Sequence, residues 1–243
     1  MKNVVLFSSA RSGGNLLDGL IRKYQNVKVL GEMYNRRPHH YFNKIDNILK
    51  KYGRYTLSNE KLFRLIEDEY KDEYDILLSR FHYTHFRFRY NENVFDLFDN
   101  FGKILLYREN FINKLVSFNI VVKDTKKWHY SKQDILPDYK KYTIFFGKKY
   151  VENQLNRLKR NYNRIIDRFG SENIEFVKYE DLLENNDISY LANKFGFLNY
   201  NSKIEIPTMH INTKDNNYEY VINYDELKDL KLILKKTKHG YRF

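Results

Sequence analysis

The chain has 243 residues, which fits one large domain better than two small ones, and we expect a single domain over residues 1–243. Lys and Arg number 43 against 31 Asp and Glu, so the net charge of +12 predicts an anionic partner such as nucleic acid, an anionic membrane or a phosphorylated small molecule. Cysteine is absent, which excludes disulfides, thiolate metal sites and Cys nucleophiles. Without a signal peptide or a long apolar run, the sequence predicts a soluble, cytoplasmic protein with no membrane span.

Short apolar runs alternate with helical periodicity along the chain. The runs that predict strands are Val4–Phe7, Val27–Leu30, Ile76–Leu78, Lys103–Tyr107 and Ile174–Val177. The segments with apolar residues at helical spacing are Leu16–Ile21, Leu62–Ile66, Ile112–Val116 and Leu155–Phe169. This alternation predicts an α/β fold, a three-layer sandwich with a mainly parallel central sheet. Ligands of such sheets bind outside the carboxyl ends of the strands, where the polar clusters of this chain fall.

A polar, glycine-containing loop joins the first predicted strand to the first helix. Gly13 and Gly14 let the backbone approach a phosphate closely, and the helix N-terminus favours an anion. Arg11 adds a fixed positive charge, while Ser12 and Asn15 add side-chain donors. The alternative is an ordinary strand-to-helix turn whose arginine points to water. The loop lacks the Walker A lysine, which argues against a kinase.

Two segments resemble the PAPS-dependent sulfotransferases, where PAPS is 3′-phosphoadenosine 5′-phosphosulfate. Ser9-Ala10-Arg11-Ser12-Gly13-Gly14-Asn15-Leu16-Leu17 is similar to the family's 5′-phosphosulfate loop, with Gly14 and Asn15 at positions where the family has hydroxyl residues. Arg108, at the end of the fourth strand, and Ser117, nine residues later on a helix, resemble its 3′-phosphate motif. The pattern is closest to bacterial carbohydrate sulfotransferases of the Nod-factor type. The resemblance implies a P-loop-kinase-like sulfotransferase fold, with nucleotide contacts from Arg11 to Leu16 and from Arg108 and Ser117.

Two further residues are nucleotide contacts by the same resemblance. Tyr179 follows the last core strand, where a family tyrosine packs on the adenine, although a tyrosine at a strand end is also typical of a core edge. Lys214 lies in a late loop and would reach the 3′-phosphate, although a lysine in an Asn-rich loop is commonly exposed. The implied donor is PAPS, the product is adenosine 3′,5′-bisphosphate (PAP), and no metal is required.

The resemblance implies a catalytic general base, and two residues qualify. Glu32 follows Gly31 at the end of the second strand and resembles the catalytic carboxylate of bacterial carbohydrate and tyrosylprotein sulfotransferases. His82 ends the third strand and resembles the histidine of cytosolic sulfotransferases. Glu32 is favoured, with Arg11 as the electrophilic group beside the leaving oxygen. Either base could instead be structural, with Glu32 paired to Arg36 or Arg37.

The segments 33–62 and 81–100 follow the strands that carry the two candidate bases, so we expect them to shape the acceptor site. Their aromatic and cationic residues suit a carbohydrate or glycolipid, and equally other anionic small molecules or a peptide. A basic nucleic-acid-binding protein and a kinase-like phosphotransferase are the alternatives, although no nucleic-acid recognition motif is found. We expect a small-molecule or glycan acceptor and no nucleic-acid partner. The sequence indicates no oligomeric state.

Overall fold

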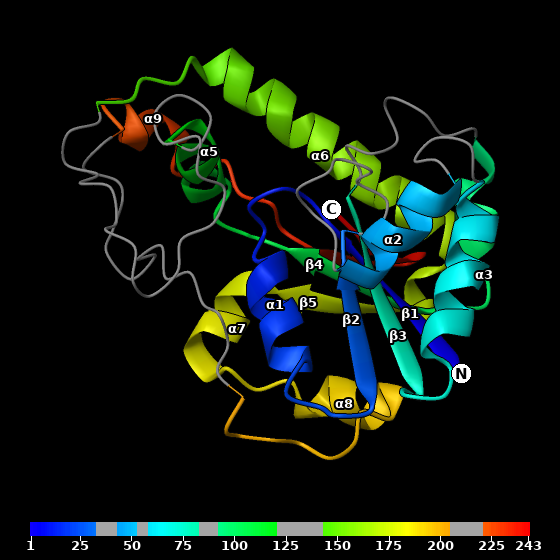
Figure 1. Cartoon of the computed structure of the whole chain (residues 1–243). Helices are drawn as coiled ribbons and strands as arrows, with labels where there is room; N and C mark the ends of the chain where they lie inside the picture. The colour runs from blue at the N-terminus through cyan, green and yellow to red at the C-terminus, as the bar shows by residue number, and fades with distance from the viewer. Residues whose placement is uncertain (33–42, 53–57, 83–91, 121–142, 205–220) are drawn as a thin grey trace.

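The computed structural model describes residues 1–32, 43–52, 58–82, 92–120, 143–204 and 221–243. Five strands form one sheet in the order β2-β3-β1-β4-β5, and every neighbouring pair is parallel (Figure 1). The strands are β1 (Lys2–Ser8), β2 (Val27–Gly31), β3 (Ile76–His82), β4 (Gly102–Tyr107) and β5 (Ile174–Lys178). All five predicted strands and the parallel sheet are confirmed.

Helices connect the strands, and the four that the sequence predicts are present. The helices are α1 (Gly14–Ile21), α2 (Asn43–Tyr52), α3 (Asn59–Tyr70), α5 (Phe111–Ile120), α6 (Lys148–Phe169), α7 (Tyr179–Asn185), α8 (Ser189–Phe195) and α9 (Tyr224–Leu227). Two 3₁₀ helices, η2 (Glu92–Phe98) and η5 (Ser171–Asn173), and an antiparallel hairpin of β6 (Lys235–Thr237) and β7 (Gly240–Arg242) complete the described elements. Within those residues, no helix is both long and apolar enough to cross a membrane.

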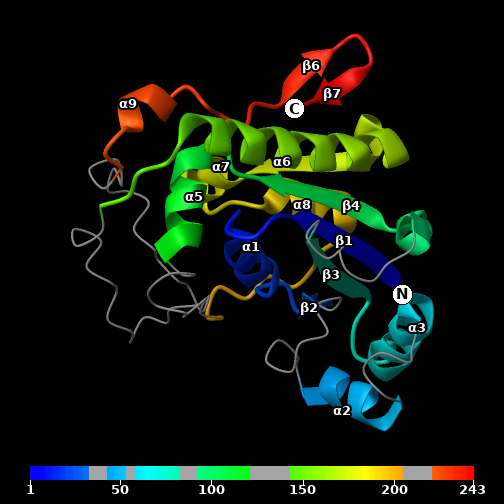
Figure 2. The same ribbon diagram turned by 90° about the horizontal axis from the view of Figure 1, so that it is seen from above.

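The sheet is covered on both faces, which confirms the three-layer sandwich. Val5 and Phe7 of β1 face a core formed with α3, α5 and α6, whereas Val4 and Leu6 face a second core formed with α1, α7 and α8. Figure 2 shows α1 and α6 on opposite sides of β1 and β4. Two-sided burial explains why the strands are continuous apolar runs and do not alternate with polar residues.

The topology favours a ligand site at the carboxyl ends of β1 and β4, which are neighbours in the sheet. The chain leaves β1 for α1 on one face and leaves β4 for α5 and α6 on the other. Their carboxyl ends therefore form a topological switch point, where open α/β sheets bind ligands. The predicted phosphate loop follows β1 and Arg108 follows β4, so both segments begin at this point.

Candidate functional site

The loop after β1 makes a tight turn before α1 begins. The N–H of Ser12 donates to the carbonyl of Ser9 at 3.2 Å, and the N–H of Leu16 donates to the carbonyl of Gly13 at 3.0 Å. Arg11 (φ 63°) and Gly13 (φ 92°) both adopt the left-handed backbone conformation. This conformation is uncommon for a residue with a side chain, so Arg11 holds a strained position that the surrounding contacts must maintain.

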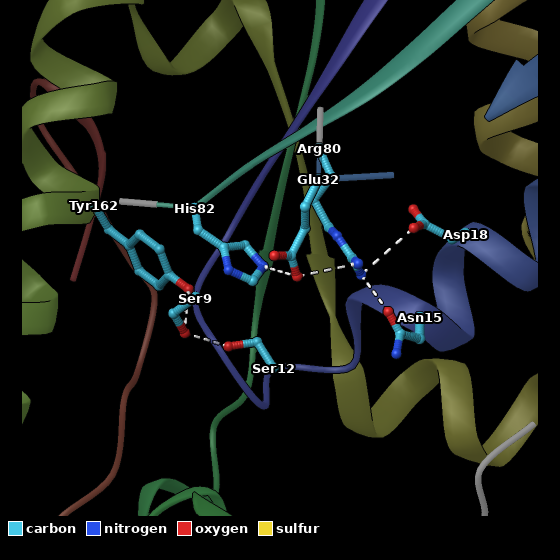
Figure 3. Close-up of polar contacts among 8 residues, drawn as sticks. All are labelled: Ser9, Ser12, Asn15, Asp18, Glu32, Arg80, His82 and Tyr162. Carbon is cyan, nitrogen blue, oxygen red and sulfur yellow. Dashed lines mark hydrogen bonds and ion pairs between the residues drawn. The ribbon is translucent and has the colours of Figure 1, made fainter. Parts of the chain in front are cut away.

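The side chains of Ser9 and Ser12 attach this loop to the body of the protein. Their hydroxyl groups are hydrogen-bonded to each other, and the Tyr162 hydroxyl of α6 lies 3.2 Å from the Ser9 Oγ (Figure 3). The Tyr162 hydroxyl also donates to the carbonyl of Leu106 in β4 at 3.1 Å. Ser12, a predicted nucleotide contact, is therefore buried on a hydrogen-bond chain that joins the loop to α6 and β4.

The structure brings the two predicted phosphate segments into contact. The Nε of Arg11 donates to the Oγ of Ser117 on α5 at 2.9 Å, across 106 residues of sequence. The guanidinium of Arg108 lies against the loop and donates to the carbonyl of Arg11 at 3.5 Å. Arg108 and Ser117 are both buried. Arg11, Arg108 and Ser117 thus form one polar group at the switch point.

Tyr179 and Glu180, which begin α7, hold the loop and α5 in place. A Cβ atom on Gly13 would lie 2.0 Å from the Tyr179 ring, and the Arg108 guanidinium lies 4.8 Å from the ring centroid. The Glu180 carboxylate accepts hydrogen bonds from the backbone N–H groups of Glu109 at 3.1 Å and Asn110 at 3.0 Å. The segment after β5 therefore supports both phosphate segments at once.

Arg80 of β3 connects the end of β2 to α1 (Figure 3). Its Nη1 donates to the Oδ1 of Asn15 at 2.7 Å and lies 3.4 Å from Asp18, while its Nη2 donates to the Oε1 of Glu32 at 3.2 Å. The side chain is only 7% exposed, so these contacts are little screened by solvent. A Cβ atom on Gly14 would lie 2.3 Å from Nη1, so the second loop glycine makes room for this guanidinium.

The two candidate bases lie side by side. The Nε2 of His82 is 3.4 Å from the Oε1 of Glu32, the same oxygen that Arg80 contacts. Arg80 pairs with Glu32, whereas Arg36 and Arg37, the partners that the sequence suggested, lie outside the described residues. On the other side of Arg80, burial raises the pKa of Asp18, and the guanidinium opposes that shift. The resulting group holds a carboxylate and an imidazole in fixed positions.

Arg80 and Glu180 are the functional candidates that sequence reasoning did not select. The signal for Arg80 is its position two residues before His82 on a strand that is buried throughout. The signal for Glu180 is a carboxylate directly after Tyr179, at the carboxyl end of a strand. Leu16 is partly buried against the core on the α1 face, and Lys214 lies outside the described residues. Among the residues that are described, no group of three or more His, Asp or Glu could hold a metal ion.

No protein-family model matches the sequence, and no curated protein matches it. Similar solved structures include the sulfotransferase domain of the Synechococcus PCC 7002 olefin synthase, at 16% identity and a TM-score of 0.43, covering 83% of this chain and 75% of that one. The sulfotransferase domain from the curacin biosynthetic pathway is 14% identical, with a TM-score of 0.48, covering 85% and 77%. A sulfotransferase from Alicyclobacillus acidocaldarius is 12% identical, with a TM-score of 0.46, covering 90% and 89%.

Proposed function

We propose that this chain is a PAPS-dependent sulfotransferase. The observation that carries the proposal is the contact of Arg11 with Ser117, together with that of Arg108 on the Arg11 carbonyl. These residues come from the two segments that resemble the phosphate motifs of that family. They meet at the switch point of a parallel sheet, where a nucleotide is expected to bind.

The residues present suit a nucleotide with phosphate groups on the 3′ and 5′ positions of the ribose. Arg108 and Ser117 would hold the 3′-phosphate through a guanidinium fork and a hydroxyl. The loop at Gly13 and Gly14 and the N-terminus of α1 would hold the 5′-phosphosulfate, because backbone N–H groups and the helix dipole favour an anion there. Tyr179 supplies an aromatic face beside the loop, and we retain Lys214 as a further contact to the 3′-phosphate.

The chemistry is an in-line transfer between two oxygen atoms. The acceptor hydroxyl oxygen forms a bond to sulfur, the bond from sulfur to the bridging phosphate oxygen breaks, and PAP leaves with the electron pair. Arg11 stabilises the negative charge that develops on the leaving oxygen. The hydroxyl proton passes to Glu32, with His82 as the alternative base, and Arg80 keeps the Glu32 carboxylate in position. The scheme requires no metal.

We propose a carbohydrate or glycolipid hydroxyl as the acceptor. The support is the position of Glu32 directly after β2, which matches the carboxylate of the bacterial carbohydrate sulfotransferases that the sequence resembles. A panel of sugars, lipids and tyrosine peptides, each assayed for transfer of radiolabelled sulfate from PAPS, tests this part. Transfer to a tyrosine peptide alone would overturn it.

The cysteine-free composition supports the cytoplasm as the site of action.

Thermal unfolding with three ligands tests the donor. PAP at about 100 times its dissociation constant should stabilise the protein by about 2.7 kcal/mol, whereas ATP–Mg²⁺ and a single-stranded oligonucleotide should not. Arg108→Met should abolish the shift. Arg168→Met is the matched control, because Arg168 is an exposed arginine paired with Asp96 and Asp99 and lies outside the site. Stabilisation by ATP–Mg²⁺ and not by PAP would refute the proposal.

A further inference from the structure

Lys114 is a buried lysine beside the predicted 3′-phosphate residues. It lies on α5 three residues before Ser117, so both side chains project from the same side of the helix. Lys114 is only 7% exposed, and its Nζ lies 5.5 Å from the centroid of the Phe111 ring. Within the described part of the chain, its ammonium group makes no hydrogen bond and no ion pair. A buried ammonium in this situation is costly unless a ligand neutralises it.

Among the residues that the structure describes, the charges that act on Lys114 are positive. They come from Arg108 at the end of β4 and from Arg157 of α6, the helix beside α5 (Figure 2). Arg157 donates to the side-chain oxygen of Gln154 at 2.5 Å, but its Nε is buried without a hydrogen-bond partner in the described residues. Neither Lys114 nor Arg157 has a carboxylate partner among those residues. Burial and the two guanidinium groups lower the pKa of Lys114 to about 7.

We propose that Lys114 and Arg157 complete the 3′-phosphate site, and that Lys114 takes up a proton from solvent when the phosphate binds. The inference rests on the proposed function and adds two residues to its nucleotide site. A phosphate monoester brings close to two negative charges at pH 7 and three strong acceptor oxygens. It would offset most of the positive charge of the basic cluster of Arg108, Lys114 and Arg157, and its charge favours the ammonium form of Lys114. A nucleotide without a 3′-phosphate would not do so.

The pH dependence of binding follows from this coupling. Below pH 7 Lys114 already carries its proton, so binding costs no proton uptake. Above pH 7 the free protein must bind a proton for each nucleotide that it takes, and affinity falls as the pH rises. If the bound form keeps its proton up to pH 9, the dissociation constant for PAP should rise about 50-fold between pH 7 and pH 9. The phosphate itself titrates near pH 6, so it contributes little over this range.

Isothermal titration calorimetry with the full chain tests the inference. PAP and adenosine 5′-phosphate are titrated at pH 7, 8 and 9, in two buffers with different ionisation enthalpies so that proton uptake is measured directly. Wild-type protein should show proton uptake and a steep pH dependence with PAP, but neither with adenosine 5′-phosphate. Lys114→Met should bind PAP weakly without pH dependence. Lys114→Arg, whose charge is permanent, should bind tightly at pH 9 without proton uptake.

Two controls separate this inference from the proposed function. Lys149→Met removes an exposed lysine at the start of α6 and should behave as wild type. Arg157→Gln should weaken PAP at every pH, because it removes one cation of the basic cluster. A wild-type pH dependence that persists in Lys114→Met overturns the inference alone. Failure of the wild-type protein to bind PAP at any pH overturns the proposed function together with it.

Discussion

Replacing Lys114 with methionine should stabilise the unliganded protein, and the gain should depend on pH. In the unfolded chain the lysine titrates at its ordinary pKa of 10.5, whereas in the folded protein burial, Arg108 and Arg157 lower that pKa to about 7. At about 1.4 kcal/mol per pKa unit, the charged side chain destabilises the fold by about 5 kcal/mol at pH 6, where it is protonated in both states. Methionine keeps an unbranched stem of similar length and removes the charge.

The sign of the pH dependence is fixed by which state binds more protons. Between pH 7 and 10.5 the unfolded chain holds a proton that the folded protein has lost, so the free energy of unfolding of the wild type rises with pH. At pH 9 the penalty from Lys114 is about 2 kcal/mol, because folding at that pH requires the lysine to release the proton that it holds in the unfolded chain. The advantage of the methionine variant should therefore shrink by about 3 kcal/mol between pH 6 and pH 9.

Urea denaturation of wild type, Lys114→Met and Lys149→Met at pH 6 and pH 9 measures these differences. A gain of several kcal/mol would be large, because a typical domain has a net stability of about 5–15 kcal/mol. Lys149→Met serves as the control, since its exposed lysine should leave the free energy of unfolding within about 0.5 kcal/mol of the wild type. A methionine variant that is less stable than wild type at pH 6 would refute the reasoning and show that the ammonium group has partners within the protein.

Three further predictions concern the loop and its supports. Gly13→Ala should weaken PAP binding at least tenfold by calorimetry, because its Cβ would meet the Tyr179 ring. Gly147→Ala is the control, since a Cβ at Gly147 would have nothing within 4 Å, and equal losses of affinity in the two variants would contradict the prediction. Arg80→Met should lower kcat far more than it raises the dissociation constant for PAP, and an unchanged kcat would exclude a positioning role. Glu180→Gln should lower the free energy of unfolding, measured in urea, by about 1–2 kcal/mol, because the carboxylate accepts hydrogen bonds from two backbone N–H groups. An unchanged free energy of unfolding would mean that the glutamine amide replaces the carboxylate.

Most of the sheet could be predicted from the sequence because its strands are buried on both faces. Val4–Phe7 reads as an unbroken apolar run for that reason, and α6 has a long apolar stripe that ends at Phe169. The short helices α7, α8 and α9 span two turns or fewer, which is too short for a periodicity to be recognised. Their positions depend on tertiary contacts, such as those of the Glu180 carboxylate with the start of α5.

The membership of the site could be predicted in part, but its internal contacts could not. Arg11 and Ser117 were each selected from a local pattern, yet their hydrogen bond depends on β1 and β4 being neighbours in the sheet. No local pattern contains that strand order. The contact of Glu32 with His82 has the same origin, since β2 and β3 are adjacent. Two residues that appeared as alternatives in the sequence therefore form one group in the structure.

The excess of positive charge in the sequence predicts an anionic partner but does not indicate which cations bind it. Two buried lysines, Lys103 and Lys114, differ in a way that bears on this question. Burial lowers the pKa of both Lys103 and Lys114, and each of these residues is less than a tenth exposed. The Nζ of Lys103 donates to the carbonyls of Asp99 at 2.9 Å and Phe101 at 2.8 Å, so the protein itself satisfies that ammonium. Lys114 has no such acceptors in the described residues and faces two guanidinium groups. A buried cation of the second kind raises the energy of the free protein, and an anionic ligand would recover that energy while the lysine keeps its proton. Among the described residues, Lys114 and Arg157 are therefore the cations that we propose for the anionic ligand, a choice that the net charge alone does not make.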